Sequence, residues 1–472
     1  MTGATRQLAR RGFALVAVLW VVIIVAIMLL GVRRNSWANS AAARNELGAV
    51  QARWLARAGV EQAMAVLEDD TLDADGSTDL WYDSETDFHN FALVGGSFTV
   101  SAPAEEGEAL TVRFGLVDHA GLVNVNAADA NQLAALDDGL LLDETQVDSI
   151  LDWIDSNDDI RPGGAEAGYY NRLTYPYEIR NGRIPTLPEL RLVKGIDDET
   201  FYGEDADQDG VLDSSEDDGD ASFPPDDADG QLRVGLSGLC TVYSYDQNTD
   251  ATGQPRINMS NADRTTMVQQ LNFTDALADA VVRQRRGRRL RSVTDLVGIR
   301  GESSASGGQS GGSAASAGGT TGSSAGATGG TSGSSSSGQG GGTVNEITLA
   351  WVAQNFDRIT VARGATTRGR INVNTASKET LLTLPSLSAE SAEAIVARRI
   401  SAKGAYTSVG QLLGDPLTEP EFRAVAERCT VRSNVFEVRS AGVTDLGIRH
   451  EIRAVIDRGT TPIAILYWYE SE

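Results

Sequence analysis

The stretch GFALVAVLWVVIIVAIMLLGV, from Gly12 to Val32, decides the fold of this chain. Its first glycine is followed by twenty residues without a charged or strongly polar side chain. A helix of that length spans roughly 30 Å, which is the thickness of the hydrocarbon layer of a bilayer. Arg6, Arg10 and Arg11 precede the run and are expected to stay on the cytoplasmic side. The sequence therefore predicts one membrane-spanning helix.

The residues after this run indicate that the helix is kept and continues. Arg33 and Arg34 stand where a secretory signal would have a cleavage site with small residues. From Asn45 to Asp70, apolar side chains recur among polar neighbours, which predicts an amphipathic helix leaving the membrane. These apolar side chains are Leu47, Val50, Trp54, Ala58, Met64 and Leu67. If only the N-terminal residues are considered, an ordinary signal anchor is the alternative interpretation.

The junction Gly12-Phe13 resembles the cleavage site of type IV prepilins and type II secretion pseudopilins. In these families a prepilin peptidase cuts after the glycine and methylates the new N-terminus, so the resemblance implies processing at Gly12 and a methylated Phe13. The fifth residue after the cut is usually Glu, but here it is Ala17. That Glu offsets the amine of a neighbouring subunit in the bilayer, where an unpaired charge costs several kcal/mol. In this respect the chain is similar to the large minor subunit K of type II secretion, which is placed at the filament tip.

Composition excludes several classes of function. The net charge of −25 and the isoelectric point near 4.5 argue against nucleic acid as a partner, because phosphate contacts need clustered Lys and Arg. The three histidines, His89, His119 and His450, stand far apart in the sequence, so neither a zinc site nor a catalytic residue is indicated, and we expect no enzyme. Cys240 and Cys429 could form one disulfide in an oxidising compartment or stay buried thiols.

Three related stretches organise the middle of the chain. They are GLVNVNAAD at 121–129, RINMSNAD at 256–263 and RINVNTAS at 370–377. Each ends in a polar residue suited to cap a following helix, and the second and third copies continue into an Arg-rich helix. Short strands are expected to alternate with these helices, at Cys240–Ser244, Arg358–Val361 and Cys429–Ser433. The copies resemble helix-hairpin-helix, or SAM-like, units.

Such units raise an alternative, a minor pilin of a type IV pilus or competence system whose helical units contact DNA. DNA-binding hairpins use glycines that let backbone N–H groups approach phosphate. The hairpins here read LNFT at 271–274 and LPSLS at 384–388. The basic cluster from Arg285 to Arg291 could serve nucleic acid, but a protein contact or a solvated helix end is favoured for it. We therefore expect no nucleic-acid partner.

The first copy carries a more specific resemblance. DWID at 152–155, GAE at 164–166, YPY at 175–177, ELRLV at 189–193 and LYW at 466–468 occur in the order shown by subunit K of type II secretion. The resemblance implies an α+β fold, in which an N-terminal transmembrane helix packs on an antiparallel pilin-like sheet interrupted by a large helical insertion. Alternating or β-rich segments independently predict strands at Ser97–Ser101, Leu110–Phe114, Phe436–Arg439, Glu451–Ile456 and Ile463–Trp468.

These features give the expected division of the chain. The predicted segments are a leader (1–12), a transmembrane helix (13–34), a pilin-like helix with the first strands (35–116), a first helical unit with a calcium loop (117–240), a second helical unit (241–301), a Gly/Ser-rich linker (302–343), a third helical unit (344–433) and C-terminal strands that complete the sheet (434–472). The linker is almost wholly Gly, Ser, Ala and Thr, so it is expected to be disordered.

An acidic stretch in the first helical unit matches the calcium loop of EF-hands. The motif predicts oxygen ligands from Asp205, Asp207, Asp209, the Val211 carbonyl, Asp213 and Glu216, with Gly210 at the sharp turn. Without a cation these carboxylates would repel one another, so a disordered acidic loop is the alternative. Calcium in the helical domain is also what the resemblance to subunit K implies.

A second acidic cluster could hold another cation. Its candidate ligands are Asp155, Asp158, Asp159 and Glu166, beside Asp152 and Asn157. Helix capping and solvated turns explain these residues equally well.

The resemblance thus implies a minor pseudopilin of type II protein secretion, held in the inner membrane by one span with most of the chain in the periplasm. It implies a place at the pseudopilus tip, where the subunit initiates or caps assembly for the export of folded proteins across the outer membrane. The expected partners are other minor pseudopilins and the major pseudopilin, the prepilin peptidase, the inner-membrane secretion platform and the lipid bilayer.

Overall fold

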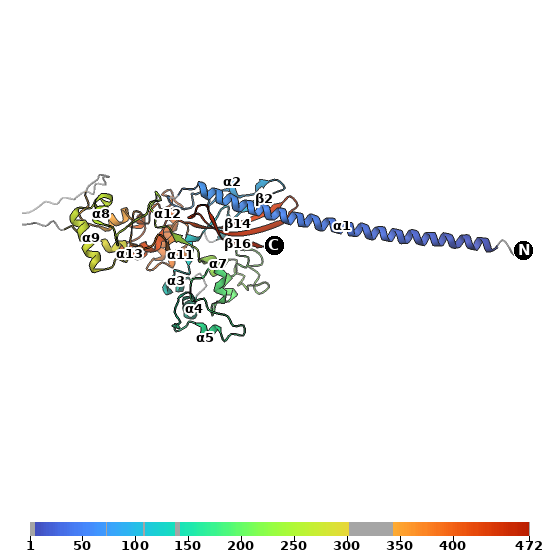
Figure 1. The fold of residues 1–472 in the computed structure, drawn as a ribbon, viewed down its shortest axis with the longest axis horizontal. Coiled ribbons are helices and arrows are strands. Elements are labelled where there is room, and N and C mark those ends of the chain that lie inside the picture. Colours follow the sequence, from blue (N-terminus) through green and yellow to red (C-terminus); the bar gives the residue numbers. More distant parts are fainter. Residues whose placement is uncertain (1–4, 72, 107–108, 137–141, 302–342, 472) are drawn as a thin grey trace, which may run out of the picture. The chain divides into compact units, whose positions relative to one another are not determined.

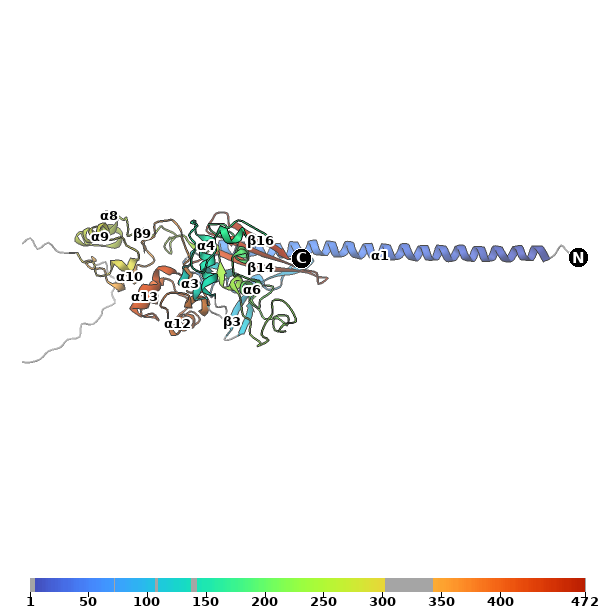
Figure 2. The same cartoon turned by 90° about the horizontal axis from the view of Figure 1, so that it is seen from below.

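The computed structural model describes residues 5–71, 73–106, 109–136, 142–301 and 343–471, whose fold is shown in Figures 1 and 2. The chain forms two compact units. The first, called the pilin unit below, comprises Met1–Gln247, Arg368–Thr407 and Arg428–Glu472, and the second, called the inserted unit, comprises Asn248–Thr367 and Ser408–Glu427. The linker predicted at 302–343 lies outside the described residues except for its last position.

One helix, α1 (Thr5–Asp69), runs through the predicted membrane span and the amphipathic segment without a break. Its part from Leu15 onward is long and apolar enough to cross a membrane. All side chains from Leu15 to Ser40 are exposed. In Figures 1 and 2 this N-terminal part of the helix projects beyond the sheet, whereas the C-terminal part lies along it.

The C-terminal part of α1 packs on a six-stranded sheet in which every strand pair is antiparallel. The strand order is β1-β2-β14-β15-β16, and β5 also pairs with β14. The strands are β1 (Phe91–Leu93), β2 (Gly96–Val100), β5 (Val117–Asp118), β14 (Val435–Thr444), β15 (Arg449–Asp457) and β16 (Ala464–Ser471). The predicted α+β, pilin-like class is confirmed.

Small residues make the closest contact between α1 and the sheet. Ala52, Ala56 and Ala63 are fully buried. Gly442 of β14 lies so close that a Cβ atom at its position would collide with backbone atoms of Ala52 and Ala56. The helix therefore approaches the strand directly, because neither partner has a bulky side chain there.

The apolar side chains that the sequence assigned to the amphipathic part of α1 do not all face the sheet. Leu67 is buried as expected, but Leu47, Val50 and Trp54 are 69%, 50% and 62% exposed. These three residues follow the helical repeat on a different side of α1 from Ala52 and Ala56. The helix thus carries two apolar stripes, and the one that packs on the sheet combines small residues with larger ones: Ala52, Ala56, Ala63, Leu55, Val60 and Leu67.

The segment 110–114, predicted as a strand of the main sheet, forms a separate hairpin instead. β4 (Ala109–Arg113) pairs with β3 (Ala102–Glu106) and with no strand of the six-stranded sheet. Along β14, the edge that β4 would need is already used by β2 up to Ser440 and by β5 at Phe436 and Glu437. No place beside β14 is left for a further strand.

The three related stretches each form the same small unit. A two-residue strand pairs in parallel with a strand from much later in the chain: β6 (Val123–Asn124) with β7 (Cys240–Thr241), β9 (Ile257–Asn258) with β10 (Ile359–Thr360), and β12 (Ile371–Asn372) with β13 (Cys429–Thr430). In each first strand the Asn side chain accepts a hydrogen bond from the N–H two residues later. The predicted caps Asp129, Asp263 and Ser377 then each open a helix.

The remaining elements are short. In the pilin unit they are α2 (Glu85–Phe88), η1 (His119–Gly121), α3 (Ala130–Ala134), α4 (Glu144–Ile154), α5 (Ala167–Tyr170), η2 (Leu187–Leu192), α6 (Asp198–Tyr202), α7 (Leu236–Leu239), β8 (Tyr245–Asp246), α11 (Lys378–Leu382) and α12 (Ala389–Arg399). In the inserted unit they are α8 (Arg264–Leu271), α9 (Asp275–Gly287), η3 (Val293–Leu296), α10 (Leu349–Gln354), η4 (Val409–Leu412) and α13 (Glu419–Val425). β11 (Thr367–Arg368) and η5 (Ala426–Arg428) lie where the chain passes between the units.

The compact units cut across the predicted third helical unit, 344–433. Its first part packs with the second copy, since the backbone of Val344 forms a β-bridge with Phe273 and that of Glu346 forms one with Arg300. Residues 368–407, by contrast, belong to the pilin unit. The sequence shows where a helical copy begins, but it does not show from which later segment the partner strand of that copy comes.

Candidate functional site

The acidic loop from Asp205 to Glu216, between α6 and α7, folds as a compact set of turns. Gln208 and Gly210 adopt positive φ angles of 59° and 73°, which fits the predicted sharp turn at the glycine. The Gly210 N–H donates to Asp205 Oδ2 at 3.2 Å, and the Val211 N–H donates to Asp209 Oδ1 at 2.7 Å. The loop is thus ordered by its own carboxylates.

Three of the predicted ligands converge. Carboxylate oxygens of Asp205, Asp207 and Asp209 lie within 4.8 Å of one another, and among the described residues this is the group of acidic side chains that meets this spacing. Asp205 is only 3% exposed, and its Oδ1 has no hydrogen-bond partner within the described part of the chain. A buried, unpartnered carboxylate oxygen costs free energy unless a cation satisfies it.

Glu216 closes the loop. Its Oε1 accepts from the Ala206 N–H at 2.9 Å and its Oε2 from the Asp213 N–H at 3.2 Å, so the carboxylate ties the two ends of the loop together. Asp213 is exposed, and its Oδ1 accepts from both the N–H and the hydroxyl of Ser215 at 2.6 Å. Glu216 therefore closes the loop through backbone hydrogen bonds but does not belong to the convergent group of three aspartates, and Asp213 lies on the exposed side of the loop.

Burial and mutual repulsion shift the acidities in this loop. Burial raises the pKa of Asp205 to about 6 and that of Glu216 to about 7, and neighbouring carboxylates add to both shifts. Hydrogen bonds from Ser215 lower the pKa of Asp213. An all-oxygen set with two carboxylates of raised pKa fits a hard divalent cation, which would supply the missing positive charge.

The second predicted cluster is organised differently. Arg161 Nη1 donates to Asp152 Oδ1 at 2.6 Å and to Asp155 Oδ2 at 2.7 Å, so a guanidinium stands where a cation would be needed. Asp158 accepts from the Asn181 side chain at 2.9 Å. Glu166 is 3% exposed and both of its carboxylate oxygens lack a hydrogen-bond partner among the described residues.

Burial, helped by the charges of Asp152 and Asp155, raises the pKa of Glu166. Asp159 is exposed and donates its N–H to Asn157. The structure therefore brings Asp155 and Glu166 into one electrostatic neighbourhood without gathering the four predicted ligands, and a cation there stays a prediction.

Both cysteines are free and buried. Cys240 belongs to β7 and Cys429 to β13, and burial raises the pKa of each thiol to about 12. Of the two alternatives that the sequence left open, the structure shows buried thiols.

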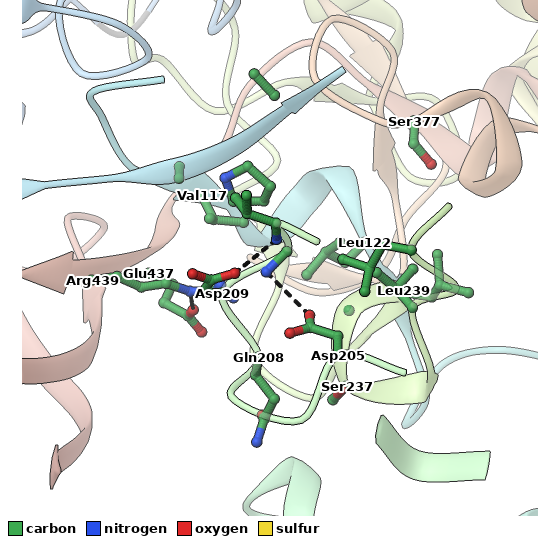
Figure 3. Close-up of a pocket in the computed structure, with 18 of the residues that line it drawn as sticks. Val117, Leu122, Asp205, Gln208, Asp209, Ser237, Leu239, Ser377, Glu437 and Arg439 are labelled. Carbon is green, nitrogen blue, oxygen red and sulfur yellow. Dashed lines mark hydrogen bonds and ion pairs between the residues drawn. The ribbon is translucent and has the colours of Figure 1, made fainter. Parts of the chain in front are cut away.

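Sequence reasoning missed a charged cluster beneath the acidic loop. Glu437 of β14 is 4% exposed and contacts Arg439 at 2.5 Å, Arg453 of β15 at 2.9 Å and His119 at 3.7 Å. Figure 3 shows Asp205, Gln208, Asp209, Glu437 and Arg439 around one groove. The signal was present in the strand FEVR at 436–439, where charged residues alternate with apolar ones.

The hairpin of the second helical copy is covered by the chain itself. The Thr274 N–H donates to the Val344 carbonyl at 2.8 Å, and the Val344 N–H donates to the Asn272 carbonyl at 2.7 Å. In the third copy Ser386 takes a positive φ of 61° where DNA-binding hairpins use glycine, and Ser388 caps α12. Neither hairpin has the glycine-lined N–H groups that phosphate recognition uses.

Comparison with known proteins shows which parts of the chain resemble known families. Residues 114–202 match the family described as type II secretion system (T2SS), protein K, and residues 367–415 match the helix-hairpin-helix motif. A chain of the crystal structure of the GspK-GspI-GspJ complex from the enterotoxigenic Escherichia coli type 2 secretion system aligns with a TM-score of 0.44 at 13% identity, covering 91% of this chain and 99% of that one. No curated protein matches the sequence.

The protein K match begins just before the first helical unit and ends at Tyr202, before the acidic loop, so it bears on the N-terminal part of that unit and not on the cation site. It includes the segments DWID, GAE, YPY and ELRLV on which the sequence-based resemblance rested. The resemblance of this chain to protein K of the type II secretion system is therefore confirmed.

Proposed function

We propose that this chain works as minor pseudopilin K of a type II protein secretion system, as a structural subunit and not as an enzyme. The observation that carries the proposal is the protein K match at 114–202 in a chain whose long apolar helix packs on an antiparallel sheet. In this proposal the subunit serves the export of folded proteins across the outer membrane. Its sister pseudopilins, the secretion platform and the prepilin peptidase are its partners.

The proposed position in the cell follows from α1. The apolar part of the helix is anchored in the inner membrane, and the rest of the chain lies in the periplasm. Processing removes residues 1–12, and Phe13 becomes a methylated N-terminus.

The proposed place at the filament tip rests on the composition of the span. Neither Asp nor Glu occurs between Phe13 and Asn45, and Ala17 stands at the position that would neutralise the amine of a neighbouring subunit. A subunit stacked above this one would leave that amine unpaired in hydrocarbon. The chain is therefore suited to the end of a filament, where it initiates or caps assembly.

The exposed stripe Leu47, Val50 and Trp54 is the proposed contact with sister subunits. Arg57 holds its guanidinium 5.5 Å from the centre of the Trp54 ring and 6.0 Å from that of Trp468 in β16, which fixes the tryptophan near the sheet edge. A contiguous apolar stripe with an ordered aromatic residue is typical of a protein interface.

Crosslinking tests this contact and the tip position together. A photo-crosslinking amino acid at position 54 should join the chain to sister pseudopilins, in about one copy per filament. The same reagent at position 60, where Val60 is 1% exposed against the sheet, should give only intramolecular products. Products at the abundance of the major subunit, repeated along the shaft, would rule out the tip position.

We also propose that Asp205, Asp207, Asp209, Asp213, Glu216 and the Val211 carbonyl hold calcium. The convergent oxygens of three aspartates, the unpartnered Oδ1 of Asp205 and the closure of the loop by Glu216 support the assignment. Calcium there would neutralise carboxylates that otherwise repel one another.

The stabilisation by calcium is expected to grow between pH 5 and pH 7.5. Because the pKa values of Asp205 and Glu216 are raised to about 6 and about 7, the folded chain holds protons that the unfolded chain has lost. Without calcium, the two protonated carboxyl groups contribute to the free energy of unfolding. This contribution is fully present below the usual pKa of a carboxyl group, and it is lost as the pH rises through about 6 and about 7.

Calcium requires the deprotonated carboxylates. The difference in melting temperature between calcium and chelator should therefore be small at pH 5 and largest above pH 7, as scanning fluorimetry of the detergent-solubilised chain can show. An equal difference at both pH values would speak against these ligands.

A further inference from the structure

The charged cluster on β14 and β15 lies on the face of the sheet that α1 does not cover. Phe436 and Val438 belong to the core shared with α1, so the alternating residues Glu437 and Arg439 point to the opposite face. That face carries the acidic loop. The pilin sheet is thereby placed between its membrane helix and the proposed calcium site.

A direct contact ties the loop to this face. Arg453 Nη1 donates to Gln208 Oε1 at 2.6 Å, and Gln208 lies within the loop between two predicted ligands. Gly210 packs on Pro103 of β3, where a Cβ atom at the glycine would come within 2.7 Å of the proline ring. The loop therefore packs on the pilin sheet and on the hairpin of β3 and β4.

Arg439 and the loop face each other without a hydrogen bond. Arg439 Nη1 and Asp205 Oδ1 are both buried and both lack a hydrogen-bond partner among the described residues. Asp209 lies beside Arg439 in Figure 3. The positive charge of Arg439 acts on both carboxylates, and it opposes the rise in the pKa of Asp205 that burial causes.

We propose that Arg439 is the internal counter-charge of the acidic loop: it holds the loop on the sheet when no divalent cation is bound, and it weakens the affinity of the loop for calcium. Glu437 sets how strongly the loop feels this charge, because the same guanidinium donates to Glu437. Arg439 is thus a positioning residue for a site to which it supplies no ligand. The inference deepens, and rests on, the calcium site of the proposed function.

The physical basis is Coulombic competition. A guanidinium stays protonated at every accessible pH, and a charge in a partly buried site acts far more strongly than it would in water. Calcium brings two further positive charges next to Arg439, so part of the binding free energy is spent against that repulsion. Removing the arginine should therefore favour calcium, and removing Glu437 should disfavour it.

Opposite signs make the test specific. In isothermal titration of the detergent-solubilised full chain with calcium chloride, Arg439→Gln should lower the Kd about tenfold, and Glu437→Gln should raise it by a similar factor. Arg439→Lys should return the Kd towards that of the natural chain. Arg449→Gln, which changes a side chain that is 65% exposed, is the control and should leave the Kd unchanged. A weaker Kd in both Arg439→Gln and Glu437→Gln would show mere structural damage and overturn the proposal.

A second measurement does not depend on calcium. In chelator, a protease that cuts beside aspartate should cleave within residues 205–216 faster in Arg439→Gln than in the natural chain or Arg449→Gln. Equal cleavage rates would overturn the holding role of Arg439 even if calcium binds. A natural chain that binds no calcium would instead overturn the calcium site, and with it the effect of Arg439 on affinity, while faster cleavage would still support the holding role.

Discussion

Glu216→Gln is expected to remove most of the rise in melting temperature that calcium produces. The substitution keeps the shape of the side chain but removes a charge that is 3% exposed and lies between the two ends of the loop. A ligand at a hundredfold excess over its Kd stabilises the folded state by about 2.7 kcal/mol. Losing the carboxylate that closes the loop and that we propose as the bidentate calcium ligand should bring this gain close to zero.

Asp213→Asn is the matched comparison. Asp213 is exposed and its hydrogen bonds go to Ser215, so its loss should lower the calcium effect only in part. Scanning fluorimetry of the two variants and the natural chain, each in millimolar calcium and in chelator, measures the difference. Identical curves with and without calcium in the natural chain, with no calcium by elemental analysis, would return the stretch to an acidic surface loop.

Gly442→Val is expected to disrupt the packing of α1 on the pilin sheet. The added side chain would meet backbone atoms of Ala52 and Ala56, and a helix backbone cannot move aside as a flexible side chain can. Overpacking of this kind costs about 3 kcal/mol or more. For a folded unit of this size we expect the melting temperature to fall by roughly 6–12 °C.

Ala441→Val serves as the control for Gly442→Val. Ala441 is the next residue of the same strand, is only half-buried and points to the opposite face. Valine favours strands, so this variant should keep its melting temperature within a few degrees. If both variants melted like the natural chain, the close packing of α1 on β14 would be wrong.

The packing of α1 shows where sequence reasoning reached its limit. Periodicity predicted the helix and its continuation from the membrane, and the structure confirms both. It named Leu47 and Trp54 among the apolar side chains of this helix but did not show which face meets the sheet, where Ala52 and Ala56 are buried. Only the approach of Gly442 makes small residues the better partners there, and that contact joins positions nearly four hundred residues apart.

In the proposed cation site, too, the sequence predicted the local part and missed the contacts from distant segments. Spacing alone predicted the acidic loop and its turn at Gly210, because an EF-hand-type loop is a local motif. The residues beneath it, Glu437, Arg439 and Arg453, come from strands more than two hundred residues later, and no local pattern links them to the loop. At the cluster of Asp152 and Asp155, by contrast, the partner is close in sequence. Arg161 forms ion pairs with both carboxylates, which the sequence alone could have assigned to a metal.

The central claim, that this chain is a processed pseudopilin, is tested most directly by mass spectrometry of the protein extracted from membranes. Gly12 ends a short basic segment directly before the apolar run. We therefore predict that the mature chain lacks residues 1–12 and begins with methylated Phe13. An intact leader, or cleavage after the apolar run, would contradict the assignment.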